Sequence, residues 1–239
     1  MAAILVSGTA YSFAKTLPAV NNNTDQQKIQ DRHLSGFNAV DLAGSFDVYI
    51  TQGSTESVKV EAPDEVIDRI ITEVSGGVLK IYNKNDHFHW GDWFGSHKKI
   101  AIYVVAKDLN SINVSGSGDV FFREGIHTSS LKLRVTGSGD MVGKVDVKSL
   151  ESNISGSGDM KISGRADNSA VNVGGSGDFA GRNLVTINTS VRVVGSGDAD
   201  ISASNSVNAS VSGSGDIRYT GGAKNISSSK SGSGDIERF

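Results

Sequence analysis

The sequence predicts an all-β fold, a right-handed single-stranded parallel β-helix with coils of about 19 residues and a β-rich N-terminal part that contains one short helix. Three observations predict it. Gly-Ser-Gly-Asp occurs seven times, and the spacings between successive motif aspartates are 21, 19, 19, 20, 18 and 19 residues. Apolar and polar residues alternate on both sides of each motif, which is the period of a β-strand. The chain has 29 Gly and only 2 Pro in 239 residues, as many short strands joined by tight turns require.

The composition excludes several classes of protein. The net charge is −3 and no basic stripe with interleaved aromatic residues is present, so we expect no nucleic-acid partner. Cysteine is absent, which rules out disulfides and thiolate metal sites. No run of 18 apolar residues occurs, so we expect no transmembrane segment.

The first 31 residues read as targeting and linker sequence. Residues 1–14 are a short apolar run that ends in Ser12-Phe13-Ala14, and small residues at these positions fit a signal-peptidase site, although the usual positive charge is missing. We interpret residues 1–14 as a signal peptide remnant; an edge strand or disordered start is the alternative. Residues 15–31 form a polar linker. The protein is therefore expected to be secreted, periplasmic or on the outer cell surface.

Residues 32–108 form the β-rich N-terminal part. Period-two alternation predicts strands in 37–51, 58–60, 78–82 and 100–105. Pro63 ends one strand and Asp64 can cap a short helix over 64–71, whose apolar face contains Val66 and Ile70. Gly44-Ser45-Phe46-Asp47 looks like a degenerate copy of the repeat motif. The sequence leaves open whether this part is a separate domain or the first coils.

Residues 109–239 are the repeat region. Valine or isoleucine recurs two residues before most motifs, and an apolar residue follows nearly every motif Asp. A unit of this length cannot bury its apolar face alone, so the coils must stack with equivalent strands in parallel. The glycines allow a sharp corner because they accept positive φ. In the last coil Ser228 and Lys230 replace the apolar columns, and we expect Ile236 and Phe239 to fold over the open end.

The motif aspartates form a predicted structural turn ladder. In stacked coils their carboxylates lie one strand spacing apart, and each is expected to accept hydrogen bonds from the Gly and Ser amides of its own or the next corner. The alternative is a row of Ca²⁺ ions bound by carboxylates and turn carbonyls, the one cofactor that we consider. No other metal site is predicted. The ladder comprises Asp119, Asp140, Asp159, Asp178, Asp198, Asp216 and Asp235.

An aromatic loop over 83–99 contains both tryptophans of the chain, Trp90 and Trp93, and the histidines His87, His89 and His97. It can be an apolar lid over the end of the core, a ligand or partner contact through the tryptophans, or a metal site through the histidines.

A polar strip is predicted three residues before each corner glycine, where the alternation points side chains outward. It can bind a glycan or a protein, or it can simply be a solvated β-face. The strip comprises Asn113, Arg134, Asn153, Asn172, Arg192, Ser210 and Ser229.

Three groups of residues resemble the putative auto-transporter adhesin, head GIN domain family, which consists of secreted proteins common in Bacteroidetes. They are Leu34-Ser35-Gly36-Phe37, the segment from Gly44 to Gly53 with Val60-Glu61-Ala62-Pro63, and the Gly-Ser-Gly-Asp series. The resemblance covers residues 31–239. It implies a parallel β-helix-like fold, an envelope or surface location and an adhesin role, and it supplies no catalytic residues.

These observations favour a secreted, non-enzymatic surface or periplasmic binding module for a glycan or a surface protein. The alternative is a carbohydrate-active enzyme, because β-helical lyases and hydrolases use clustered Asp with Arg or Lys. A catalytic site should break the repeat at one place, and no such break is evident between Asp119 and Asp235. No catalytic residue is therefore assigned, and the oligomeric state stays open.

Overall fold

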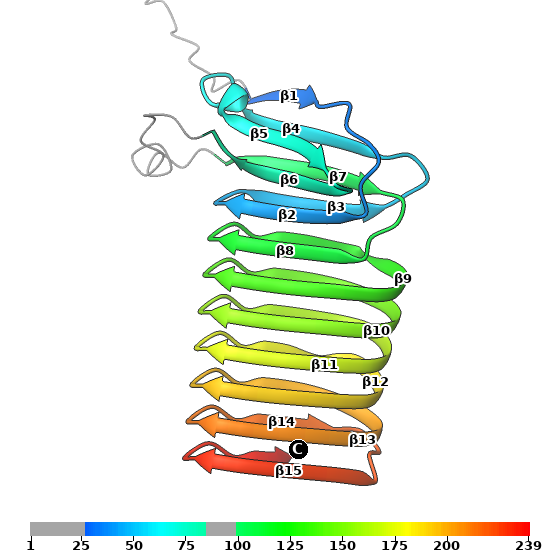
Figure 1. Ribbon diagram of the computed structural model, residues 1–239, viewed down its shortest axis with the longest axis vertical. Coiled ribbons are helices and arrows are strands. Elements are labelled where there is room, and N and C mark those ends of the chain that lie inside the picture. Colours follow the sequence, from blue (N-terminus) through cyan, green and yellow to red (C-terminus); the bar gives the residue numbers. More distant parts are fainter. Residues whose placement is uncertain (1–26, 85–98) are drawn as a thin grey trace, which may run out of the picture.

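The computed structural model describes residues 27–84 and 99–239. It confirms a parallel β-solenoid of about 7 turns with about 19 residues per turn (Figure 1). Five long strands run from one corner to the next, and each pairs in parallel with its successor. They are β9 (Val120–Gly137), β10 (Met141–Gly156), β11 (Met160–Gly175), β12 (Phe179–Gly195) and β13 (Ala199–Gly213).

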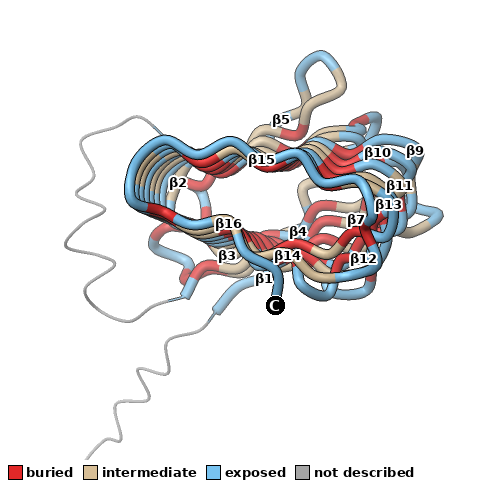
Figure 2. The backbone as a smooth tube through the Cα atoms, turned by 90° about the horizontal axis from the view of Figure 1, so that it is seen from below, coloured by how far each residue is buried: buried red, intermediate tan, exposed pale blue. Residues whose placement is uncertain are grey.

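Each coil is a flattened ring with two sheet faces around one core (Figure 2). We call the residues that follow a corner the leading face and those that precede the next corner the trailing face. The leading face continues through β3 (Asp47–Gln52), β7 (Ala101–Ala106), β14 (Ile217–Thr220) and β16 (Ile236–Arg238). The trailing face continues through β2 (Ala39–Gly44), β6 (Val78–Asn83), β8 (Ser111–Gly116) and β15 (Asn225–Gly232).

The two glycines of each corner have different physical roles. The first has φ between 115° and 136° in every motif, a conformation that favours glycine. The second has no such φ, but a Cβ there would lie under 3.0 Å from the backbone of the preceding coil. Positive φ therefore explains only the first glycine, and close stacking of the corners explains the second.

The N-terminal strands belong to the same stack. β2 pairs with β8, with Gly44 opposite Gly116, and the amides of Ser117 and Gly118 donate to the Gly44 carbonyl at 3.1 and 2.9 Å. The degenerate motif at 44–47 is therefore a corner of the solenoid. β6 and β7 pair with the other edges of β2 and β3, so the first strands of the chain lie between later ones. One buried cluster extends from Phe37 to Ala223.

Antiparallel strands cover the N-terminal end of the stack. β4 (Ser57–Pro63) pairs with β7, β1 (Gln27–Asp31) with β4, and β5 (Ile70–Ser75) with β6. The predicted short helix is one 3-10 turn, Ile67–Arg69, shorter than expected. Ile70 and Ile71 begin β5 instead, because β-branched residues suit a paired strand and no side chain caps the turn.

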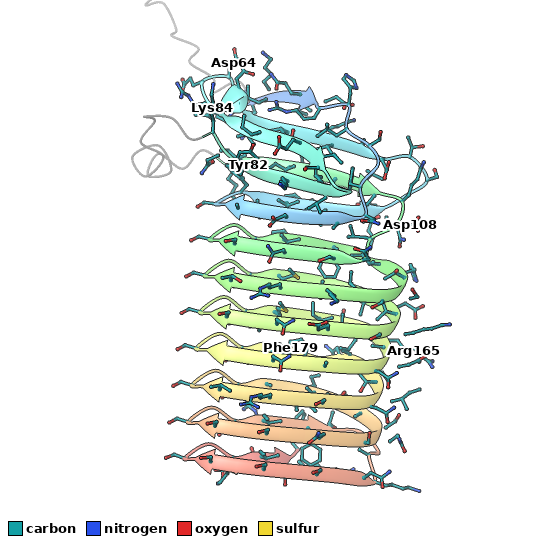
Figure 3. The ribbon with its side chains drawn as sticks, viewed as in Figure 1. Asp64, Tyr82, Lys84, Asp108, Arg165 and Phe179 are labelled. Atoms are coloured by element: carbon teal, nitrogen blue, oxygen red, sulfur yellow. The ribbon has the colours of Figure 1, made fainter. Side chains whose placement is uncertain are left out.

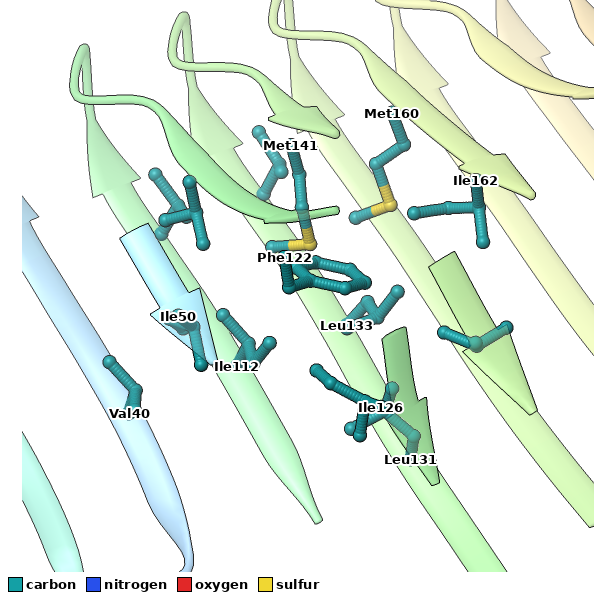
Figure 4. Packing of buried hydrophobic residues seen from close by; sticks show 14 of the residues in the cluster. Val40, Ile50, Ile112, Phe122, Ile126, Leu131, Leu133, Met141, Met160 and Ile162 are labelled. Carbon is teal, nitrogen blue, oxygen red and sulfur yellow. The ribbon is translucent and has the colours of Figure 1, made fainter. Parts of the chain in front are cut away.

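Columns of inward side chains fill the core (Figure 4). Phe122 and Met141 are fully buried in successive coils, and Met160 and Ile162 continue the packing in the next coil. Gly143 stands opposite Phe122, and a Cβ on Gly143 would overlap that ring. A large residue in one coil thus occupies the space that a glycine leaves in the next.

The C-terminal coil is polar, as predicted, because every residue of β15 is exposed. Ile236 packs partly against the core. Phe239 does not fold over the open end: it is 46% exposed, and the Arg182 guanidinium lies 4.1 Å from its ring centroid. The cation-π contact places the last residue on the outside of the leading face.

Candidate binding surface

The corner aspartates form a continuous hydrogen-bonded ladder. Oδ1 of each aspartate accepts the backbone N–H of the aspartate in the next coil, at 2.7 to 2.9 Å, from Asp119 through to Asp235. The Gly and Ser amides, which we expected to be the donors, bond instead to the carbonyl of the first corner glycine in the preceding coil. That carbonyl lies directly beside them in the stack. The column of corner side chains runs along one edge of the solenoid (Figure 3).

The ladder explains how like charges can stack at strand spacing. Each backbone N–H lies between two carboxylates and offsets part of their repulsion. Asp47 continues the column at the first corner, where burial raises the pKa of its carboxyl and the nearby charge of Asp119 raises it further. Within 27–84 and 99–239, no group of three or more His, Cys, Asp or Glu side chains could hold a metal ion. The Ca²⁺ alternative stays untested.

The predicted aromatic loop residues His87, His89, Trp90, Trp93 and His97 lie outside the described residues. The ends of the loop are defined, because β6 and β7 pair with β2 and β3 on the two faces. The loop therefore stands where other coils have the Gly-Ser-Gly-Asp corner.

The predicted polar strip lies in register across the trailing face. Asn113 pairs with Arg134, Arg134 with Asn153, and the pairing continues coil by coil to Ser229. Several amides of the strip are used within it or beside it. Asn113 Nδ2 donates to Asp41 Oδ1 at 2.7 Å, Asn172 Nδ2 to Asn153 Oδ1 at 3.1 Å, and Asn153 Nδ2 to Glu151 Oε1 at 3.1 Å.

These internal bonds reduce what the strip offers to a ligand. The hydrogen bond from Asn153, with the charge of Lys132, lowers the pKa of Glu151. A shallow depression of about 500 Å³ lies among Asn113, Arg134, Thr136 and their neighbours. Arg134 and Arg192 are the exposed cations of the strip.

Three aromatic rings stack on the leading face. Tyr49 lies between Tyr103 and Phe121, with ring centroids 5.5 and 5.2 Å apart and interplanar angles of 20°. The guanidinium of Arg123 covers Phe121, 5.1 Å from its centroid. The Tyr103 hydroxyl donates to Glu61 Oε2 at 2.8 Å, which raises the pKa of the phenol. The ring faces are thus occupied by one another, and mainly their edges meet solvent.

A hollow of about 540 Å³ lies beside this stack; we call it the leading-face hollow. It crosses β9 to β13. Cationic, polar and apolar side chains line it: Arg123, Val142, Gly143, Lys144, Lys161, Ile162, Ser163, Ala180, Arg182, Asn183 and Asp200.

The charges in the hollow are strongly unbalanced. Four cations, Arg123, Lys144, Lys161 and Arg182, meet one carboxylate, Asp200. Asp200 is already paired, with Arg182 at 3.0 Å and with Arg218 at 3.0 Å. The other three cations have no carboxylate within 4.0 Å in the part of the chain that the structure describes. The hollow can therefore hold an anionic group without breaking an existing ion pair.

Two irregular strands form the ends of the hollow. Where β10 has Lys144 alone, β9 has Arg123, Glu124 and Gly125, so β9 contains two extra residues. At the other end the register shifts between β11 and β12, where Gly181, Arg182 and Asn183 stand opposite two residues of β11. These bulged segments carry Arg123, Arg182 and Asn183 to the rim, and the regular strands β10 and β11 lie between them.

The bulges account for the two coils that exceed 19 residues. The intervals Asp119 to Asp140 and Asp178 to Asp198 span 21 and 20 residues. The expectation of an unbroken repeat was therefore wrong in length, although the motif itself is unbroken. None of the predicted ligand-binding residues lines the hollow. The uneven spacing was the signal in the sequence that could have found it.

The comparisons agree with this architecture. The sequence profile of the putative auto-transporter adhesin, head GIN domain family matches residues 36–223. The chain belongs to this family. No functionally curated protein sequence matches the chain. Within 27–84 and 99–239, no helix of this head GIN domain protein is long and apolar enough to span a membrane.

Solved structures share the fold of this head GIN domain along nearly its whole length. A putative adhesin from Bacteroides fragilis is 26% identical, with a TM-score of 0.83 over 90% of this chain and 98% of its own. A putative adhesin and a putative lipid binding protein, both from Parabacteroides distasonis, are 24% and 23% identical, each with a TM-score of 0.72 over the same shares of the two chains. The family and these neighbours support an adhesin-type role.

Proposed function

We propose that this protein is a non-enzymatic binding module that works outside the cell and holds a glycan or a protein against its leading face. The family and the Bacteroides fragilis structure support an adhesin-type role. The observation that carries the proposal is the leading-face hollow, which is concave, open to solvent and lined by polar groups on regular strands. The apolar run that ends at Ala14 supports export.

The chemistry of the hollow favours binding over hydrolysis. Glycosidases of the usual kinds need two carboxyl groups at a set separation. The hollow has one, Asp200, and arginines engage both of its oxygens. The motif aspartates give no pair either, because each uses one oxygen in the ladder. The trailing-face strip and the residues Trp90 and Trp93 are proposed as secondary contacts of the same module.

A binding screen with an assay for turnover tests the proposal. Purified protein is applied to immobilised glycans and extracellular matrix proteins, and the same glycans are assayed for cleavage. Ala180→Trp fills the hollow from an exposed position, and Ser190→Trp places the same side chain at an exposed position later in the same strand. We expect wild type and Ser190→Trp to retain a common ligand and Ala180→Trp to lose it. Cleavage of a glycan, absence of any ligand, or full binding by Ala180→Trp would overturn the proposal.

A further inference from the structure

We infer that the ligand of the leading-face hollow is an acidic polysaccharide, a sugar chain that carries carboxylate or sulfate groups. The inference rests on the proposed function and specifies its ligand. Its basis is the local charge: four cations and one carboxylate line the hollow, in a chain whose net charge is −3. Arg123, Lys144 and Lys161 have no acidic partner among the described residues, and all three are exposed. Composition does not explain such an excess on an acidic protein.

The cations are arranged to meet a linear chain. Arg123, Lys144, Lys161 and Arg182 come from β9, β10, β11 and β12, one from each of four consecutive coils. Paired strands lie about 4.8 Å apart, so the four coils span roughly 14 Å along the solenoid axis. A polymer with repeated negative charges can contact all four cations at once, whereas a single small anion cannot. Each exposed contact is weak alone, and several on one chain add up.

The remaining lining fits sugar rings. Ser163 and Asn183 offer hydroxyl and amide groups for sugar hydroxyls, and Asp200 is an acceptor at the edge. Val142, Gly143 and Ala180 supply a low apolar surface against which the C–H face of a ring can pack. This mixture of donors, acceptors and small apolar residues distinguishes the hollow from a plain patch of charge.

The same geometry disfavours other anionic partners. Single-stranded nucleic acid needs exposed aromatic faces for its bases. The faces of Tyr49, Tyr103 and Phe121 are covered by one another and by Arg123. A bilayer surface is flat and cannot enter a concave site whose rim is raised by two bulges. An acidic polypeptide would meet the charges but would not need the small apolar surface between them.

Paired polymers that differ only in charge test the inference. We would measure binding of the full chain to dextran sulfate and to neutral dextran, and to polygalacturonate as the carboxylated probe, by biolayer interferometry at low and high salt. We expect binding to dextran sulfate or polygalacturonate that weakens as salt rises, and none to dextran. Lys144→Gln with Lys161→Gln should weaken this binding about tenfold. The control, Lys148→Gln with Lys224→Gln, removes the same charge at exposed positions outside the hollow and should bind as wild type does.

The outcomes separate this inference from the proposed function. If a neutral glycan binds as well as an acidic one, and Ala180→Trp abolishes that binding, the binding module stands and the acidic ligand is wrong. Equal loss in the two lysine pairs would show non-specific charge attraction and would also overturn it. Tighter binding to polyglutamate, to single-stranded DNA or to phosphatidylglycerol vesicles would replace the polysaccharide with that class of partner. Failure of every glycan and protein to bind would overturn both.

Discussion

The second glycine of a corner should not tolerate even a methyl group. In Gly158→Ala the new Cβ would lie under 3.0 Å from the carbonyl oxygen of Gly139, and 2.9 Å from Val135 Cγ1. The carbonyl belongs to stacked backbone and cannot turn away as a flexible side chain can. Overpacking of this kind costs about 1–3 kcal/mol or more. For a chain of this size, that loss lowers the melting temperature by roughly 2–4 °C per kcal/mol, so we expect a fall of about 4–12 °C.

Gly174→Ala is the matched control in the same strand. Its Cβ would meet only the Ile154 carbonyl oxygen at 3.5 Å, an ordinary contact, and Gly174 has no positive φ. This variant should unfold within about 1 kcal/mol of wild type, since replacing glycine also reduces the entropy of the unfolded chain. Calorimetry and circular dichroism of the three proteins would measure the difference. If Gly158→Ala were as stable as Gly174→Ala, close backbone stacking would not be the reason for the second glycine.

Three further predictions concern the ladder and the aromatic stack. Asp159→Ala removes the acceptor of the Asp178 amide and should cost about 1–3 kcal/mol, whereas Asp159→Asn keeps an acceptor and should cost less; equal losses in chemical denaturation would refute the ladder. The folded-state pKa of Asp47 is raised, so its ionisation opposes folding above the unfolded-state value of 3.8. Asp47→Asn should therefore be more stable than wild type at neutral pH, with an advantage that shrinks as pH falls through the folded-state pKa and vanishes below 3.8; a constant difference across that window in a pH series of melts would contradict this. Tyr49→Ala breaks two ring contacts and should cost about 1–3 kcal/mol, while Tyr49→Phe keeps both; similar melting temperatures for the two would show that the stack contributes nothing.

The repeat itself could be predicted because stacking imposes it on every coil. Val135, Ile154 and Val173 must all point into one core, and the corner glycines must approach one another, so these positions recur at a near-constant period. The parallel pairing and the ladder of aspartates follow from the same constraint.

The order of the first coils could not be predicted from the period. β2 and β3 lie between strands that come later in the chain, and only the pairing of Gly44 with Gly116 reveals it. The residues that separate these strands in sequence form the antiparallel cap. Sequence distance therefore misleads here about which strands are neighbours.

The hollow was missed for a different reason. Its lining residues point outward, where no core constrains them, and they are spread from Arg123 to Asp200. The predicted strip was easier to see because it keeps a fixed distance from the motif. The hollow follows from changes in that distance, in the coils of 21 and 20 residues.

Hydrogen exchange with and without a sulfated dextran oligosaccharide tests the central claim most directly, that ligand binds where the two longer coils bulge. The ligand should slow exchange in segments 121–125, 142–144, 161–163 and 180–184, which hold the hollow. Segments 151–155 and 170–174 of the trailing face should be unchanged. Protection confined to the trailing-face strip, or to the loop 85–98, would contradict the account.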